Sequence, residues 1–124
     1  MAENSVVTLP ISDGKRLLGA LNKDKFRVTA ALWLLDAESQ EWQLILCSPI
    51  LRRLGPRRAY TRLQKVLLGL KGVNVKLSQI VLADGDNPLI RAFRSILTPQ
   101  SRDNQFTNCT FGNIHVDDAF VYYV

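Results

Sequence analysis

The chain has 124 residues, of which 47% are hydrophobic and 22% are charged, and its formal net charge at pH 7 is +5. It is too apolar for a disordered chain and too poor in glycine and proline for a fibrous protein, and its 2 cysteines are too few for a disulfide scaffold. A chain of this length buries about two-thirds of the surface that it exposes when unfolded, which predicts one domain over residues 1–124.

The first part of the chain predicts a helix followed by a β-hairpin. Ser12 is typical of a helix start, and a stripe of leucines follows it at helical spacing. Residues 26–35 are apolar on both alternating faces, which indicates a central strand of a sheet. The polar residues 36–40 join this strand to a second one over residues 42–47, which ends before Pro49 because proline cannot donate to a sheet.

Two further helices and a short strand follow. Gly55 and Pro56 begin the clearer helix, because proline suits the first helical position. Its apolar residues lie within about 60° of one line on a helical wheel; they are Ala59, Tyr60, Leu63, Val66, Leu67 and Leu70. Residues 80–83 indicate a short strand, and Asn87 with Pro88 predicts the cap of the next helix. The residues of that helix expected in the core are Leu89, Phe93 and Ile96, with Ile90 and Leu97 flanking them.

Apolar segments at residues 106–111, 114–116 and 119–124 are typical of closing strands, with Asp117 and Asp118 expected to form a turn or bulge between the last two. The resulting order is αββαβαββ. The early hairpin requires antiparallel pairing, whereas the helix before the third strand allows a parallel crossover. We therefore expect an α+β fold in which about three helices pack on a mixed, mainly antiparallel sheet.

The positive charge is concentrated in one block of the sequence. Residues 42–83 contain eight Lys and Arg and no Asp or Glu, while residues 103–124 contain three Asp and no base. Helical spacing places several of these cations opposite the apolar stripe, where they face solvent from one rigid element. The predicted binding residues are Arg52 and Arg53, in the loop before the helix, and Arg57, Arg58, Arg62 and Lys65 on it.

This basic loop and helix favour a non-enzymatic accessory or regulatory protein that contacts an acidic protein or a nucleic acid. The structural alternative is a solvated helix face whose long side chains cover apolar surface without binding a partner. We expect no catalytic residue, no metal and no cofactor, because no nucleophile has a base in a known motif and no glycine segment has the spacing of a phosphate loop.

A small metal- or acid/base-dependent enzyme centred on His115 and Asp117 is the alternative function. On an extended strand the two side chains point to the same face, so that the carboxylate could orient the imidazole or both could bind a metal. A metal site usually needs a third protein ligand, which Asp84 or Asp86 could supply only if the fold brings them near.

Two carboxylates at the first hairpin invite comparison with metal-dependent nucleases. Asp36 and Glu41 straddle the turn, but Gln43 stands two residues after Glu41, where such nucleases have a lysine. Both carboxylates are therefore expected at an exposed loop, and nuclease activity has no support from the sequence.

Cys47 and Cys109 lie in apolar segments without ligands at metal-binding spacing, which is typical of reduced thiols. Residues 1–5 lack the charged and apolar regions of a signal peptide, and no apolar run is long enough to span a bilayer. We therefore expect a cytoplasmic protein that does not contact a membrane.

The apolar residues 119–124 could pair with a second copy of the chain if they form an edge strand.

Several segments together carry a resemblance that covers the chain from about residue 12 to its end. They are Ala31–Asp36, Glu41–Ile45, Ser48-Pro49, Gly55–Tyr60 and Asp117–Tyr122. In these segments the chain resembles a set of small uncharacterised bacterial proteins. The resemblance implies a bacterial origin and a compact single domain, and it implies no functional residue.

Overall fold

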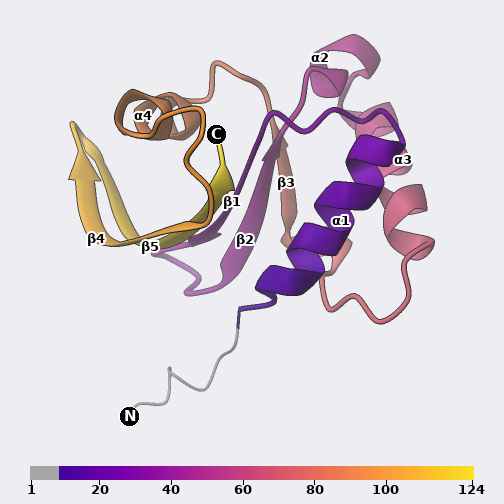
Figure 1. Ribbon diagram of the computed structural model, residues 1–124, viewed down its shortest axis with the longest axis horizontal. Helices are drawn as coiled ribbons and strands as arrows, with labels where there is room; N and C mark the ends of the chain where they lie inside the picture. Colours follow the sequence, from indigo (N-terminus) through magenta and orange to yellow (C-terminus); the bar gives the residue numbers. More distant parts are fainter. Residues whose placement is uncertain (1–8) are drawn as a thin grey trace.

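A five-stranded mixed sheet in the order β3-β2-β1-β5-β4 forms the centre of the computed structural model, which describes residues 9–124 (Figure 1). The strands are β1 (Ala30–Leu35), β2 (Trp42–Cys47), β3 (Ile80–Ala83), β4 (Asn104–Phe111) and β5 (Ile114–Tyr123). The helices are α1 (Ile11–Lys23), α2 (Ile50–Leu54), α3 (Pro56–Leu68) and α4 (Pro88–Ile96). The expected α+β fold with an early hairpin is confirmed, and the order is αββααβαββ because α2 is an additional helix.

The pairing of the strands determines which loops meet at each end of the sheet. β2 pairs with β3 in parallel, whereas the β1–β2, β1–β5 and β4–β5 pairs are antiparallel. β2, β3 and β5 therefore run in the same direction, and their carboxyl ends lie at the end of the sheet where β1 begins. The loops that follow β2 and β3 meet at this end.

One face of the sheet is covered by α1 and α3, which lie side by side in Figure 1. Its core contains Leu17, Leu18 and Leu21 from α1, Ala59 and Leu63 from α3, and Trp33, Leu44 and Leu46 from the sheet. Full burial of a side chain of this size contributes roughly 1.5–3 kcal/mol, so the apolar stripes of both helices hold them on the sheet.

A hydrogen-bonded aromatic pair lies under α1. Trp33 Nε1 donates to Tyr122 Oη at 2.9 Å, and the Tyr122 hydroxyl donates to the carbonyl of Ile11 at 2.6 Å. Gly14 allows this approach, because a Cβ atom at its position would lie 2.1 Å from Tyr122 Oη. The glycine is therefore required by packing, although glycine normally weakens a helix interior.

The other face of the sheet packs on α4, around which β4 and β5 curl in Figure 1. The Phe93 ring lies 5.1 Å from the ring of Phe106 and 5.2 Å from that of Phe111. Phe93 is buried as expected, but Ile96 is 50% exposed and Ile90 is buried in its place. The expectation for Ile96 is wrong because packing on the two strand aromatics turns the helix so that Ile90 and Phe93 face the core.

Two strand boundaries differ from those expected. β1 begins at Ala30, and residues 26–29 precede it as irregular chain that includes a positive φ of 60° at Arg27. Asp117 and Asp118 form no separate turn, because β5 is one strand and Asp118 pairs with Thr107 of β4. Pairing along β4 thus outweighs the local preference of two aspartates for a turn.

β5 lies between β1 and β4, so the expected edge pairing of residues 119–124 with a second copy is not available. Within residues 9–124, no helix has the length and apolarity needed to cross a membrane. The expectation about a signal peptide concerns residues 1–5, which lie outside the described residues.

Candidate functional site

The end of β2 leads directly into the two helices that carry the predicted binding residues. The buried Ser48 accepts a hydrogen bond through Oγ from the Ile50 amide at 3.2 Å, which satisfies a donor in the first turn of α2. Gly55 has a φ of 84°, in the left-handed region that favours glycine, and Pro56 occupies the first position of α3. These residues set where α2 ends and α3 begins.

Arg52 and Arg53 lie on α2, not in a loop, and Arg52 is engaged within the molecule. Its Nη2 lies 3.4 Å from Asp84 Oδ2 and 3.3 Å from Asp86 Oδ2, so it joins α2 to the loop after β3. The hydrogen bond to Asp86 and the charge of Asp84 raise the pKa of Arg52 above its ordinary value. Sequence order hides this contact, because both aspartates lie more than thirty positions further along the chain.

Arg62 also pairs with an aspartate. Its Nε lies 3.0 Å from Asp24 Oδ2, which connects α3 to the residue that follows α1. The Arg62 side chain is half-buried between these elements, so its first role is to hold the two helices together. Arg52 and Arg62 are therefore less available to a partner than their neighbours.

The other four predicted binding residues are Arg53, Arg57, Arg58 and Lys65; all are exposed, and none forms an ion pair with any residue from 9 to 124. Three of them lie on α3, on the side opposite the buried Ala59 and Leu63. We call Arg57, Arg58 and Lys65 the α3 cationic face. It extends over about 12 Å, since a helix rises about 1.5 Å per residue. A rigid row of cations at this spacing suits a partner with regularly placed negative charges.

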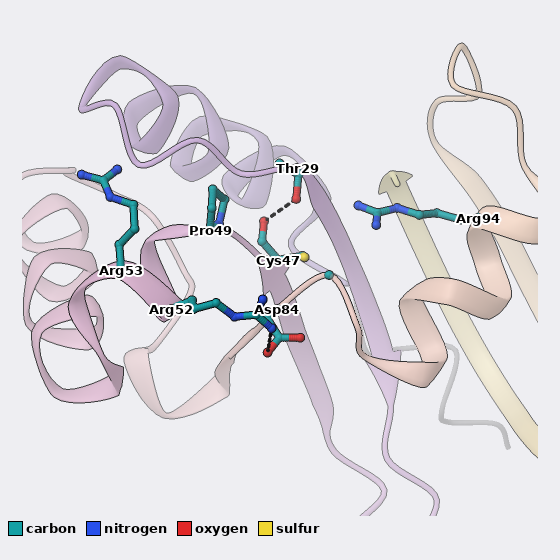
Figure 2. Close-up of a pocket in the computed structure, with 8 residues that line it drawn as sticks. Thr29, Cys47, Pro49, Arg52, Arg53, Asp84 and Arg94 are labelled. Carbon is teal, nitrogen blue, oxygen red and sulfur yellow. Dashed lines mark hydrogen bonds and ion pairs between the residues drawn. The ribbon is translucent and has the colours of Figure 1, made fainter.

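A cavity of about 510 Å³ opens at the carboxyl ends of β2 and β3 (Figure 2). It is lined by Thr29, Cys47, Pro49, Arg52, Arg53, Asp84, Gly85 and Arg94. Arg94 reaches toward it from α4, whereas Arg53 stands on the far side of Pro49 in Figure 2. The fold thus brings together four separate segments, and it places Arg52 and Arg53 at the cavity, apart from the α3 cationic face.

His115 and Asp117 meet as their spacing predicts. His115 Nε2 lies 3.0 Å from Asp117 Oδ1, and Nδ1 lies 2.9 Å from Thr110 Oγ1. The pair is open to solvent on β5, with His115 50% and Asp117 39% exposed. Asp84 follows β3, which is three strands away from β5, and lies at the other end of the sheet, so it cannot complete a site with them. Among residues 9–124, no three His, Cys, Asp or Glu side chains are placed to hold a metal ion.

Of the two carboxylates at the first hairpin, Asp36 has structural partners. Asp36 accepts hydrogen bonds from the Glu38 amide and the Ser39 hydroxyl, both at 3.1 Å. The Asp36 amide donates to the carbonyl of Glu41 at 2.9 Å and closes the turn. Asp36 thus stabilises the β1–β2 loop, as is typical of aspartate in a turn.

The residues that line the cavity could not be identified from the sequence. Thr29, Cys47 and Arg94 lie far apart along the chain, and only the parallel pairing of β2 with β3 brings their segments together. The one usable signal was the expected crossover between these strands, because ligands bind outside the carboxyl ends of parallel strands in many α/β sheets.

No protein-family model, curated protein or solved structure matches this chain. No relative therefore supplies a functional residue, and the function must be inferred from the geometry of residues 9–124.

Proposed function

We propose that this protein is a non-enzymatic binding protein with an accessory or regulatory role, and that its α3 cationic face contacts the phosphate backbone of a nucleic acid duplex. The observation that carries this proposal is the exposure of Arg57, Arg58 and Lys65 without ion pairs among residues 9–124. Aspartates of other segments neutralise Arg52 and Arg62, but the face keeps its charge.

Two features of α3 favour a phosphate backbone over an acidic protein surface. Protein interfaces usually contain an aromatic anchor, and base stacking on single strands also needs one. The only aromatic residue of α3 is Tyr60, whose hydroxyl accepts a hydrogen bond from the Leu82 amide at 2.9 Å and is thus tied to the sheet. What α3 presents is charge on a rigid element, which suits backbone contact without base recognition.

The test is the affinity for a labelled duplex of arbitrary sequence at low salt, measured by fluorescence anisotropy. Arg58→Glu is compared with Arg91→Glu, a matched charge reversal at an exposed residue of α4 on the other side of the sheet. We expect Arg58→Glu to weaken binding several-fold more than Arg91→Glu, because only Arg58 lies on the face.

Two results would contradict the proposal. If both reversals weaken binding equally, the overall net charge causes the binding and the α3 cationic face has no special role. If no duplex binds at low salt while a polyglutamate peptide does, and Arg58→Glu abolishes that binding, the partner is an acidic protein.

A further inference from the structure

The cavity at the carboxyl ends of β2 and β3 has the position and size of a small-molecule site. Ligands bind preferentially outside the carboxyl ends of parallel strands, and β2 and β3 are the parallel pair of this sheet. Its volume of about 510 Å³ lies within the range of clefts that bind a small organic ligand. It is separate from the α3 cationic face, since neither Arg57, Arg58 nor Lys65 lines it.

The charges around the cavity leave two cations without an ion pair. Among the residues that line the cavity, the charged ones are Arg52, Arg53, Arg94 and Asp84, which together carry a net charge of +2. Arg52 is held by Asp84 and by Asp86, which is exposed to solvent and does not line the cavity. Arg53 and Arg94 also line the cavity, are exposed, and form no ion pair with a residue from 9 to 124. The cavity therefore has an unbalanced positive charge that matches a doubly charged anion.

Arg94 is better placed than Arg53 to bind an anion in the cavity. Its side chain points from α4 toward Cys47 and Thr29 in Figure 2. It also lies against the loop after β3, since a Cβ atom at Gly85 would be 3.7 Å from Arg94 Nη1. A planar guanidinium in this position can donate two parallel hydrogen bonds to a phosphate. Arg53 lies beyond Pro49, with its guanidinium directed away from Arg94 in Figure 2, so it attracts an anion only at longer range.

The remaining wall of the cavity is apolar. Cys47 is buried in the cluster beneath α4, and the Pro49 ring and the Thr29 side chain continue this surface. The Thr29 hydroxyl already donates its proton to the carbonyl of Cys47 at 3.1 Å, which leaves its methyl group and its two oxygen lone pairs for a ligand. Such a wall favours a ligand with an apolar body beside its charged group.

We propose that this cavity binds a small phosphate monoester, whose phosphate is held by Arg94 and whose organic group lies on the wall formed by Cys47 and Pro49. A phosphate monoester carries close to two negative charges at neutral pH, which matches the net charge of +2 on the residues that line the cavity. A carboxylate carries one negative charge and would leave the lining with a net charge of +1. This inference does not depend on the function proposed for the α3 cationic face.

The experiment is isothermal titration calorimetry of the full chain with phenyl phosphate, inorganic phosphate and benzoate. We expect phenyl phosphate to bind more tightly than either of the others, because only it combines the dianion with an apolar body. Arg94→Ala should weaken phenyl phosphate binding at least about tenfold, and Arg94→Lys should weaken it less, since lysine keeps the charge but not the paired donors. Arg53→Ala should have a smaller effect than Arg94→Ala.

Arg91→Ala is the control, because it removes an exposed arginine of the same helix that does not line the cavity. The proposal is wrong if Arg94→Ala and Arg91→Ala bind phenyl phosphate alike, if benzoate binds as tightly as phenyl phosphate, or if no binding is detected at about 10 mM. Far-UV circular dichroism of each variant verifies that it is folded. Duplex binding by Arg94→Ala, measured in parallel, separates this site from the α3 cationic face.

Discussion

Gly14 provides the sharpest test of the packing between α1 and the sheet. In Gly14→Ala the new methyl group would lie 2.1 Å from Tyr122 Oη and 3.2 Å from Trp33 Nε1, well inside van der Waals contact. Neither neighbour can move freely, because both are fully buried and hydrogen-bonded to each other. The tyrosine must shift and release the carbonyl of Ile11.

The expected loss of stability is the sum of three contributions. Overpacking of a filled core costs about 1–3 kcal/mol, and a buried polar group left without its partner costs about 1–3 kcal/mol more. The higher helix propensity of alanine offsets about 1 kcal/mol of this loss of stability. We therefore expect Gly14→Ala to lower the free energy of unfolding by about 3 kcal/mol, a large share of the total for a domain of this size.

Gly19 supplies the matched control, because it lies in the same helix and a Cβ atom there meets nothing within 4 Å. Gly19→Ala should therefore stabilise the protein by about 0.5–1 kcal/mol through helix propensity alone. The measurement is urea-induced unfolding followed by tryptophan fluorescence and far-UV circular dichroism. If Gly14→Ala proves as stable as Gly19→Ala, the close contact of α1 with Tyr122 is refuted.

Two further predictions concern pH and helix capping. Burial raises the pKa of Tyr122 from 10.0 to about 12, so above pH 10 the unfolded chain releases this proton before the folded one does. The native protein should therefore lose stability between pH 10 and pH 12, as measured by urea unfolding at each pH. Tyr122→Phe should lose less stability over this range, which would verify that ionisation of Tyr122 is the cause. Asn87 accepts hydrogen bonds from the amides of Leu89 and Ile90 at the start of α4, so Asn87→Ala should cost about 1 kcal/mol in the same assay, and no change would refute the cap.

Most of the fold could be predicted because its signals are local. The hairpin follows from two apolar runs separated by a short polar turn, and α4 follows from the cap formed by Asn87 and Pro88. α2 was missed because it has only five residues, which is too short for a periodic pattern. The rotation of α4 and the continuity of β5 depend on partners distant in the sequence, such as Phe106. Patterns of neighbouring residues therefore do not predict these two features.

The candidate site was predicted only in part, because ion pairs join segments whose approach the sequence does not show. The positive block itself follows directly from composition. That Asp84 would neutralise Arg52, and that Asp24 would neutralise Arg62, depends on where the loops after β3 and α1 lie. Arg94 is not among the predicted binding residues for the same reason: it lies outside the positive block, and only the placement of α4 brings it to the cavity.

The salt dependence of duplex binding tests the role of the α3 cationic face most directly. Each phosphate contact contributes about 0.9 to the slope of log K against log salt concentration. Arg57→Ala, Arg58→Ala and Lys65→Ala should therefore each reduce this slope by about 0.9, while Arg91→Ala should leave it unchanged. Equal slopes for the native protein and all four variants would contradict the account.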